Sequence, residues 1–311
     1  MTKKKSLNMR HLISMESFDE VLIKSLIDDA KDYLNLITKK EYVSNKLSGK
    51  VITILFFEPS TRSRYSFQLA ANRLGAIVLN PELSSASIQK GETLIDTVRT
   101  LEAMGTHVFI IRHPDNNVAG YVASELMSTT SIINAGDGSN QHPTQTLVDL
   151  FTISQYKSDF KKIKVAIVGD VAHARVAHSL VDGLKIMQTE EIRIIAPDAF
   201  IPSDAKTWGV HIYNSLEEGL DNVDVIYALR IQKERMDKTQ LPDNEKFFNK
   251  FGLTADALTY ANPEAIVMHP GPMNRGVEIE STVADGPQSV ILNQVRNGVA
   301  MRMAILELLL L

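Results

Sequence analysis

The sequence predicts an α/β fold of two domains, each a largely parallel sheet flanked by helices, with a C-terminal helix that returns to the first domain. Three observations favour this class. Short apolar runs alternate with helical patterns along most of the chain, which is typical of parallel sheets. The chain has 311 residues, whereas single hydrophobic cores stop growing near about 250–300 residues. The apolar runs form two successive series, which meet near Pro143.

The first series opens with a helix near Ser17, because Ser17 and Glu20 have the spacing of a capping box. The continuous apolar run 51–57 is typical of a strand that is buried on both faces. A helix is expected to follow from Thr61, with apolar residues along one face and Gly75 as its C-terminal stop.

Two further strands, 108–111 and 131–134, are expected before a long helix that begins at Pro143, since a first turn tolerates proline. The second series is expected to hold a helix at 176–184 and strands at 163–169, 192–196, 210–213, 225–229 and 265–269. A last helix at 292–310 follows it. We therefore expect a first domain of residues 1–142 with 290–311, and a second domain of residues 143–289.

Composition excludes several classes of protein. A net charge of −4 argues against a nucleic-acid binder, which would normally present a basic face, so an anionic substrate would need a local cluster of Arg and Lys. The chain has no cysteine, which excludes disulfides, thiolate nucleophiles and cysteine-based zinc sites, and which fits a cytoplasmic location. The N-terminal residues lack the apolar segment of a secretory signal, and we expect no membrane partner.

The block Ser60-Thr61-Arg62-Ser63-Arg64 stands where a predicted strand gives way to a helix. A helix N-terminus offers unpaired N–H groups and a positive dipole end, and therefore attracts anions. Ser60 suits the N-cap, Thr61 and Ser63 add hydroxyl donors, and Arg62 adds a fork that matches phosphate. A capped surface helix with solvated arginines is the alternative, but capping explains one serine and not the whole block. We predict a phosphate site here.

Two more motifs of the first series lie at strand ends, where open α/β sheets bind ligands. Arg112-His113 follows the strand 108–111, and His142 and Gln145 lie one turn apart at a predicted helix start. The alternatives are a solvated loop charge for Arg112 and a capping histidine for His142. The residues alone leave these alternatives open.

The second series carries Arg175 after a predicted strand and the run 230–235, which begins with Arg230. Two arginines at strand ends suit a dicarboxylate, since each can grip one carboxylate, although helix-surface charge is the alternative. The loop 269–272, His-Pro-Gly-Pro, presents carbonyl acceptors that suit an NH2 group, or is simply a rigid turn. Lys90 lies in a polar stretch that reads as a loop, where a lysine is usually solvated.

The sequence lacks the motifs of several other kinds of binding site and active site. The sequence has no G-x-G-x-x-G after a strand, no Gly-Lys-Ser/Thr phosphate loop, no His-Glu-x-x-His and no nucleophile elbow. We therefore expect neither a cofactor nor a metal.

Together these motifs resemble the aspartate/ornithine carbamoyltransferase family, over nearly the whole chain and in the same order. The block 60–64 is similar to the family's Ser-Thr-Arg-Thr-Arg phosphate loop, and 142–145 to its His-Pro-x-Gln signature. Motifs typical of the aspartate branch stand at 90–93, 112–114, 134–138 and 230–235. The ornithine branch typically has His-Cys-Leu-Pro, where this chain reads His-Pro-Gly-Pro.

The resemblance implies transfer of a carbamoyl group from carbamoyl phosphate to L-aspartate, which yields N-carbamoyl-L-aspartate and phosphate in the committed step of de novo pyrimidine (UMP) biosynthesis. It implies a carbamoyl-phosphate-binding first domain and an aspartate-binding second domain, without a metal or a cofactor. Two alternatives remain: another carbamoyltransferase that uses ornithine or a related amine, and a non-catalytic two-domain anion-binding protein.

The resemblance also implies roles for single residues. Carbamoyl phosphate would be bound by Ser60, Thr61, Arg62, Ser63, Arg112, His142, Gln145, Pro270, Gly271 and Pro272. Among them, Ser63, Arg112 and His142 would face the carbonyl oxygen, whereas Gln145 and the carbonyls of Pro270 and Gly271 would hold the NH2 group. Aspartate would be bound by Lys90, Arg175, Arg230, Gln232 and Gly271. The catalytic set would be Arg62, Ser63, Lys90, Arg112, His142 and Gln145.

The remaining implied roles concern domain closure and assembly. Glu234 would orient Arg230, and Glu58 would bridge to Arg175 and Arg235 when the domains close. A loop with Ser87 and Lys90 would come from a neighbouring subunit of a homotrimer, so that a monomer would be nearly inactive. Regulatory chains or a dihydroorotase are possible further partners.

Three positions depart from the family pattern. Ser63 stands for the usual threonine, Ala86 precedes Ser87 where some members have a serine pair, and Gly271 replaces a bulkier residue of some members. Backbone carbonyls survive the change at Gly271, but the fit of the substrate is expected to differ.

Overall fold

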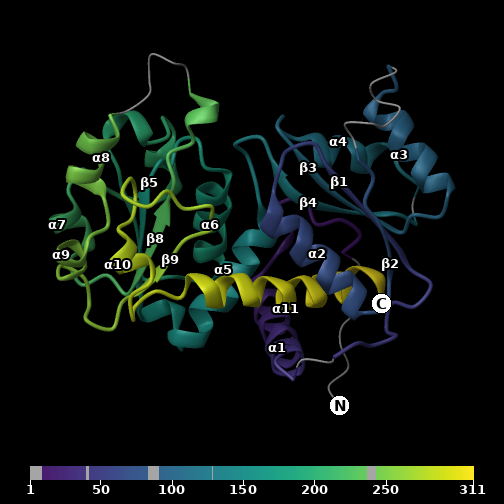
Figure 1. The fold of residues 1–311 in the computed structure, drawn as a ribbon, viewed down its shortest axis with the longest axis horizontal. Helices are drawn as coiled ribbons and strands as arrows, with labels where there is room; N and C mark the ends of the chain where they lie inside the picture. Colours follow the sequence, from purple (N-terminus) through teal and green to yellow (C-terminus); the bar gives the residue numbers. More distant parts are fainter. Residues whose placement is uncertain (1–8, 40–41, 83–90, 128, 237–242) are drawn as a thin grey trace. The chain divides into compact units, whose positions relative to one another are not determined.

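The computed structural model describes residues 9–39, 42–82, 91–127, 129–236 and 243–311, which divide into two compact units. The first unit is Met1–Thr144 together with Gly298–Leu311, and the second is Gln145–Asn297. Each unit holds one sheet flanked by helices (Figure 1), so the predicted two-domain α/β fold is confirmed.

The sheet of the first unit has the order β2-β1-β3-β4, and every neighbouring pair is parallel. Its strands are β1 (Val51–Phe56), β2 (Ile77–Leu79), β3 (Val108–His113) and β4 (Ser131–Asp137). From β1 the chain first adds β2 on one side and then crosses to add β3 and β4 on the other. The topological switch point, where open α/β sheets bind ligands, therefore lies between β1 and β3.

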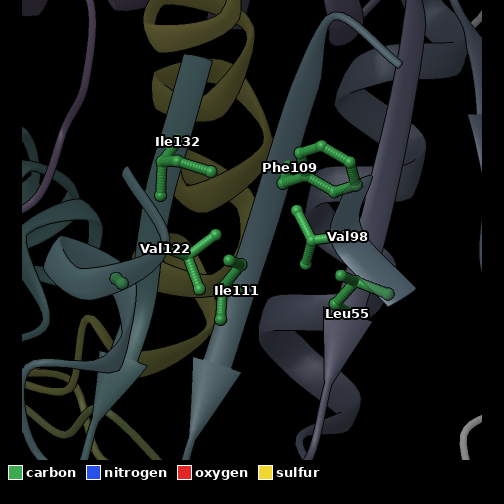
Figure 2. Packing of buried hydrophobic residues seen from close by; sticks show 7 residues of the cluster. Leu55, Val98, Phe109, Ile111, Val122 and Ile132 are labelled. Carbon is green, nitrogen blue, oxygen red and sulfur yellow. The ribbon is translucent and has the colours of Figure 1, made fainter. Parts of the chain in front are cut away.

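Helices of the first unit pack on the sheet through apolar side chains. They are α1 (Glu20–Ile37), α2 (Thr61–Arg73), α3 (Leu94–Ala103), α4 (Val118–Glu125) and the C-terminal part of α11 (Ile291–Leu310). Figure 2 shows α3 and α4 meeting β1, β3 and β4 through Leu55, Val98, Phe109, Ile111, Val122 and Ile132. Burial of such side chains stabilises each by about 1.5–3 kcal/mol relative to exposure.

The C-terminal helix α11 packs against α1 and α2 (Figure 1), so the predicted return of this helix to the first domain is confirmed. The guanidinium carbon of Arg302 lies 4.8 Å from the centroid of the Phe67 ring in α2. Tyr33 of α1 donates a hydrogen bond to Glu307, and Lys46 forms a 3.0 Å ion pair with the same carboxylate. These contacts bring the end of the chain into the first unit.

The sheet of the second unit has the order β7-β6-β5-β8-β9 and is also parallel throughout. Its strands are β5 (Lys164–Gly169), β6 (Glu191–Ile195), β7 (His211–Tyr213), β8 (Val225–Leu229) and β9 (Ile266–Met268). Its helices are α5 (Pro143–Tyr156), α6 (Arg175–Ile186), α7 (Leu216–Leu220), α8 (Asn244–Phe251), α9 (Ala255–Leu258) and α10 (Ser281–Ala284). The switch point here lies between β5 and β8.

Several predicted boundaries are wrong. The first α-helix begins at Glu20 with Asp19 as its cap, whose carboxylate accepts from Leu22 N at 2.7 Å, because Ser17 ends a separate 3-10 turn. Strands β3 and β4 run on to His113 and Asp137, so Arg112 lies inside a strand and not beyond it. The sequence reading also missed β2, α3, α4 and the short helices of the second unit.

Gly75 is confirmed as the stop of α2. It has a φ of +80°, and a Cβ there would lie 2.6 Å from Ser44 O, so only glycine fits without strain. Within the described residues, no helix combines the length and the apolar character needed to cross a bilayer.

Candidate active site

In each unit, several of the site residues predicted from the sequence follow the strands at the switch point of the sheet. In the first unit, β1 leads through residues 57–60 into α2, and the neighbouring strand β3 ends with Arg112 and His113. Phe57 N donates to Arg112 O at 2.8 Å, which ties the two strand ends together. The predicted phosphate block and Arg112 therefore stand at the same edge of one sheet.

The N-terminus of α2 is poorly neutralised. Ser60 occupies the N-cap position, but its side chain makes no capping hydrogen bond to any described residue. The first turn contains no acidic residue and instead carries Arg62 and Arg64, although cations at this end oppose the helix dipole. Thr61 and Arg62 are exposed, whereas Ser63 is buried. This helix end is suited to an anion, because N–H groups and arginine side chains gather there without an acidic residue in the first turn.

The guanidinium of Arg112 contacts Ala135 and Glu58 within the first unit. Its Nη1 donates to Ala135 O at 3.2 Å, and its Nε lies 3.3 Å from the Glu58 carboxylate. Both side chains are about four-fifths buried, at 16% and 22% exposure, so their attraction is screened less than at the surface. Glu58 therefore orients Arg112 in this structure. Its predicted bridge to Arg175 and Arg235 stays a prediction.

A buried carboxylate that the sequence reading did not single out shapes the loop before His142. Asp137 accepts hydrogen bonds from Asn117 N at 2.8 Å, Gln141 N at 3.0 Å and Asn134 Nδ2 at 3.1 Å. Asn134 Nδ2 also donates to Ile13 O at 2.9 Å, which anchors the N-terminal segment. This loop fixes where the backbone enters α5, and so it places His142, which is buried.

Replacing Asp137 with alanine is expected to lower the free energy of unfolding by about 3 kcal/mol, because several buried donors would lose their acceptor. Turnover is expected to fall about 10- to 100-fold as His142 shifts. Urea denaturation and steady-state kinetics measure the two effects. Asp32→Ala on the exposed face of α1 is the control, and an equally small change in both variants would contradict the role of Asp137.

At the second switch point, the buried carboxylate of Asp170 joins the two loops that follow β5 and β8. Its Oδ2 accepts from Gln232 N at 2.9 Å, while its Oδ1 accepts from His173 N at 3.3 Å and lies 2.8 Å from His173 Nδ1. Arg235 Nη1 adds a bond to His173 O at 2.9 Å. Arg175 begins α6 directly after this loop and is buried.

Arg230 projects from the end of β8 into a network of acceptors. Nη1 donates to Glu234 Oε2 at 2.9 Å and to Ile231 O at 3.3 Å. Nη2 donates to Gln232 Oε1 at 3.1 Å and to the other oxygen of Glu234. The hydrogen bonds with Glu234 raise the pKa of Arg230 and lower the pKa of Glu234. Glu234 and Gln232 thus orient a permanently charged guanidinium.

The loop 269–272 is ordered by His269. Its Nδ1 accepts from Gly271 N at 2.8 Å, so Nε2 carries the proton and faces the Glu278 carboxylate at 3.3 Å. Pro270 and Pro272 have no N–H, and the Gly271–Pro272 peptide bond is cis. The loop therefore presents more backbone acceptors than donors.

Two predicted residues, Ser87 and Lys90, lie outside the described residues. Of the others, Ser60, Thr61, Arg62, Ser63, Arg112 and His142 belong to the first unit, while Gln145, Arg175, Arg230, Gln232, Pro270, Gly271 and Pro272 belong to the second. Among the described residues, no group of three His, Asp or Glu side chains is arranged to hold a metal ion.

Known proteins match this chain over nearly its whole length. Family models described as aspartate/ornithine carbamoyltransferase match residues 10–155 with the carbamoyl-P binding domain and residues 161–309 with the Asp/Orn binding domain. The aspartate carbamoyltransferase catalytic subunit of Coxiella burnetii (strain Dugway 5J108-111) is 51% identical over 301 residues, which cover 97% of this chain and 96% of the relative.

Solved structures agree with the sequence relatives. Aspartate transcarbamoylase from Trypanosoma cruzi in complex with carbamoyl phosphate and aspartate is 34% identical, with a TM-score of 0.86 and 98% of both chains covered. The same enzyme with N-(phosphonacetyl)-L-aspartic acid is 36% identical, with a TM-score of 0.86 over 98% of this chain and 97% of that one. The chain belongs to the aspartate/ornithine carbamoyltransferase family.

Proposed function

We propose that this protein transfers the carbamoyl group of carbamoyl phosphate to the amine of L-aspartate. The observation that carries the proposal is the presence of anion-binding groups at both switch points: the start of α2 in the first unit, whose first turn has no acidic residue, and the oriented Arg230 in the second. The names of the Coxiella burnetii and Trypanosoma cruzi relatives support the same reaction, which would supply pyrimidine synthesis.

The first unit would bind the phosphoryl group and activate the carbonyl. The N–H groups at the start of α2 and the Thr61 and Arg62 side chains suit a dianion. Negative charge grows on the carbonyl oxygen during attack, and Ser63, Arg112 and His142 would stabilise it. One such donor typically contributes about 3–4 kcal/mol to lowering the barrier.

The second unit would bind the amine substrate. Arg175 would take the α-carboxylate of aspartate, and Arg230 with Gln232 would take the β-carboxylate. A new C–N bond forms at the carbamoyl carbon while its bond to the phosphate oxygen breaks. The amine loses a proton in this exchange, and the departing phosphate is a suitable acceptor for it.

Assembly is part of the proposal. Ser87 and Lys90 would reach the site of a neighbouring subunit in a homotrimer, and regulatory or dihydroorotase chains would be further partners. Support for the trimer comes from the family resemblance of the 87–93 segment. Light scattering on the purified chain measures its oligomeric state. A stable monomer with full activity would contradict active sites shared between subunits.

Purified protein supplied with carbamoyl phosphate is expected to release phosphate with aspartate at least about 1000-fold faster than with ornithine, at equal concentration. Arg230 gives the physical reason, because it pairs with a side-chain carboxylate and repels the ornithine ammonium. Faster release with ornithine would establish the rival carbamoyltransferase. Binding of carbamoyl phosphate without release on addition of either amine would establish the anion-binding protein instead.

A further inference from the structure

A fully buried carboxylate in the second unit organises groups that the proposed reaction needs. Asp149 of α5 is 0% exposed. Its Oδ1 accepts from Gln145 Nε2 at 2.8 Å and from Gln294 Nε2 at 2.6 Å, and its Oδ2 accepts from Tyr227 OH at 2.7 Å. Burial of a carboxylate costs free energy unless hydrogen bonds compensate it, and these three hydrogen bonds also fix the orientation of the donors that make them.

The bond to Asp149 decides which end of the Gln145 amide is available to a ligand. A carboxylate only accepts hydrogen bonds, so the NH2 end of Gln145 must face Asp149. Gln145 and Asp149 are one helical turn apart, which allows this contact within α5. The carbonyl end of the Gln145 side chain is thereby kept as an acceptor for a donor on the substrate.

A second branch leads from the same carboxylate to the loop 269–272. Because Gln294 donates its NH2 to Asp149, its Oε1 points the other way and accepts from His269 N at 3.1 Å. His269 in turn accepts from Gly271 N through Nδ1 at 2.8 Å. Asp149 thus sets, through Gln294 and His269, the backbone that carries the carbonyls of Pro270 and Gly271.

Tyr227 of β8 is the third partner of Asp149 and also interacts with Gln294 of the loop branch. Its hydroxyl donates to Oδ2, the oxygen that neither glutamine uses. Burial and the neighbouring Asp149 raise the pKa of Tyr227, which keeps the hydroxyl protonated as a donor. The carboxylate is therefore held from three sides by β8, α5 and α11.

We propose that Asp149 is a positioning residue that turns three acceptors, the Gln145 amide oxygen and the carbonyls of Pro270 and Gly271, toward a donor substrate bearing NH2. This inference rests on the proposed function and deepens it. Acetyl phosphate has the size and charge of carbamoyl phosphate but carries a methyl group where the latter has NH2. A methyl group leaves the acceptors unpaired, so the network selects carbamoyl phosphate against acetyl phosphate.

The Asp149→Leu variant tests the selection, because its apolar side chain has no acceptor for either glutamine NH2 group and so releases both branches. We measure kcat/KM for carbamoyl phosphate at saturating aspartate, and the inhibition constant of acetyl phosphate as a competitor. The expected result is a fall in kcat/KM of about 100-fold, with the acetyl phosphate constant within about 3-fold of wild type. Damage to the site in general would weaken both ligands together, which would overturn the inference.

A second variant keeps the test decisive if Asp149→Leu does not fold. Gln294→Met removes the loop branch together with the contact of Gln294 to Tyr227, and leaves Gln145 bonded to Asp149. The fall in kcat/KM is therefore expected to be about 10-fold, again without change for acetyl phosphate. Unchanged kcat/KM in folded Gln294→Met would overturn the inference.

Asn297→Ala is the matched control. Asn297 lies one turn beyond Gln294 on α11, is buried, and donates to Thr152 Oγ1 at 3.0 Å and Gln155 Oε1 at 2.9 Å on α5. Asn297→Ala should destabilise the protein while leaving unaltered both kcat/KM for carbamoyl phosphate and the inhibition constant of acetyl phosphate. A fall in kcat/KM as large as that of Gln294→Met would overturn the inference. Failure of the wild type to release phosphate from carbamoyl phosphate would instead refute the proposed function.

Discussion

Alanine in place of Arg62 is expected to abolish carbamoyl transfer, with kcat/KM for carbamoyl phosphate lower by about 1000-fold or more, while the fold stays intact. Arg62 stands in the first turn of α2, at the end of the helix where the dipole favours an anion, and its side chain is exposed. Since a cation there opposes the dipole, its removal should leave the melting temperature unchanged or slightly raised.

The control for Arg62→Ala is Arg73→Ala, the same substitution in the last turn of the same helix. Arg73 donates to Tyr42 O at 3.4 Å and favours the helix dipole, so its loss is expected to cost stability and spare turnover. Phosphate release and thermal melts measure the two variants side by side. Near-normal turnover in Arg62→Ala, or an equal loss in Arg73→Ala, would remove the phosphate assignment from the start of α2.

Sequence patterns predicted those parts of the site whose residues are close together in the chain. The block 60–64 combines a strand end, a helix start and a cluster of hydroxyl and guanidinium groups, all within one short segment. Strands of buried parallel sheets read as continuous apolar runs, so β1 and β8 were also found close to their observed bounds. The switch points follow from the order of strands, which the sequence alone does not state.

Contacts between distant segments were beyond the reach of sequence patterns. Asp149 meets Gln294 across 145 positions, and Asp170 meets Gln232 across 62. In the sequence each is an ordinary acidic residue near an apolar run, and each is buried only by segments that tertiary folding brings to it: α11 and β8 at Asp149, and the loop after β8 at Asp170. The missed strand β2 has three residues and the missed helices α7, α9 and α10 have four or five, which is too short for periodicity to show.

The first helix illustrates how a local rule can select the wrong residue. Ser17 and Glu20 satisfy the spacing of a capping box, but Asp19 is closer to the helix and its carboxylate caps Leu22 N. Capping preferences of serine and aspartate are similar, so the choice depends on where the preceding chain turns. The 3-10 turn Met15–Ser17, with buried Met15, makes that choice through packing.

Alanine in place of Arg230 is expected to reduce kcat/KM for aspartate by about 100-fold, while the KM for carbamoyl phosphate stays within about 3-fold of wild type. A charge-assisted bond to the β-carboxylate would be lost, whereas the residues of the proposed phosphate site belong to the first unit. Steady-state kinetics with each substrate varied in turn separate the two effects. Equal losses for both substrates would contradict the assignment.

Lys233→Ala is the control for Arg230→Ala, because Lys233 is an exposed cation in the same turn after β8. If the general positive field of this turn attracted aspartate, both variants would weaken aspartate binding alike, and added salt would reduce both effects. Arg230 differs from Lys233 in its geometry, since Glu234 and Gln232 hold both terminal nitrogens in fixed directions. Those acceptors also occupy the nitrogens, so binding the β-carboxylate in a bidentate manner requires at least one of them to yield. Glu234→Gln, which removes the competing charge but keeps an acceptor, is therefore expected to alter the KM for aspartate far less than Arg230→Ala does.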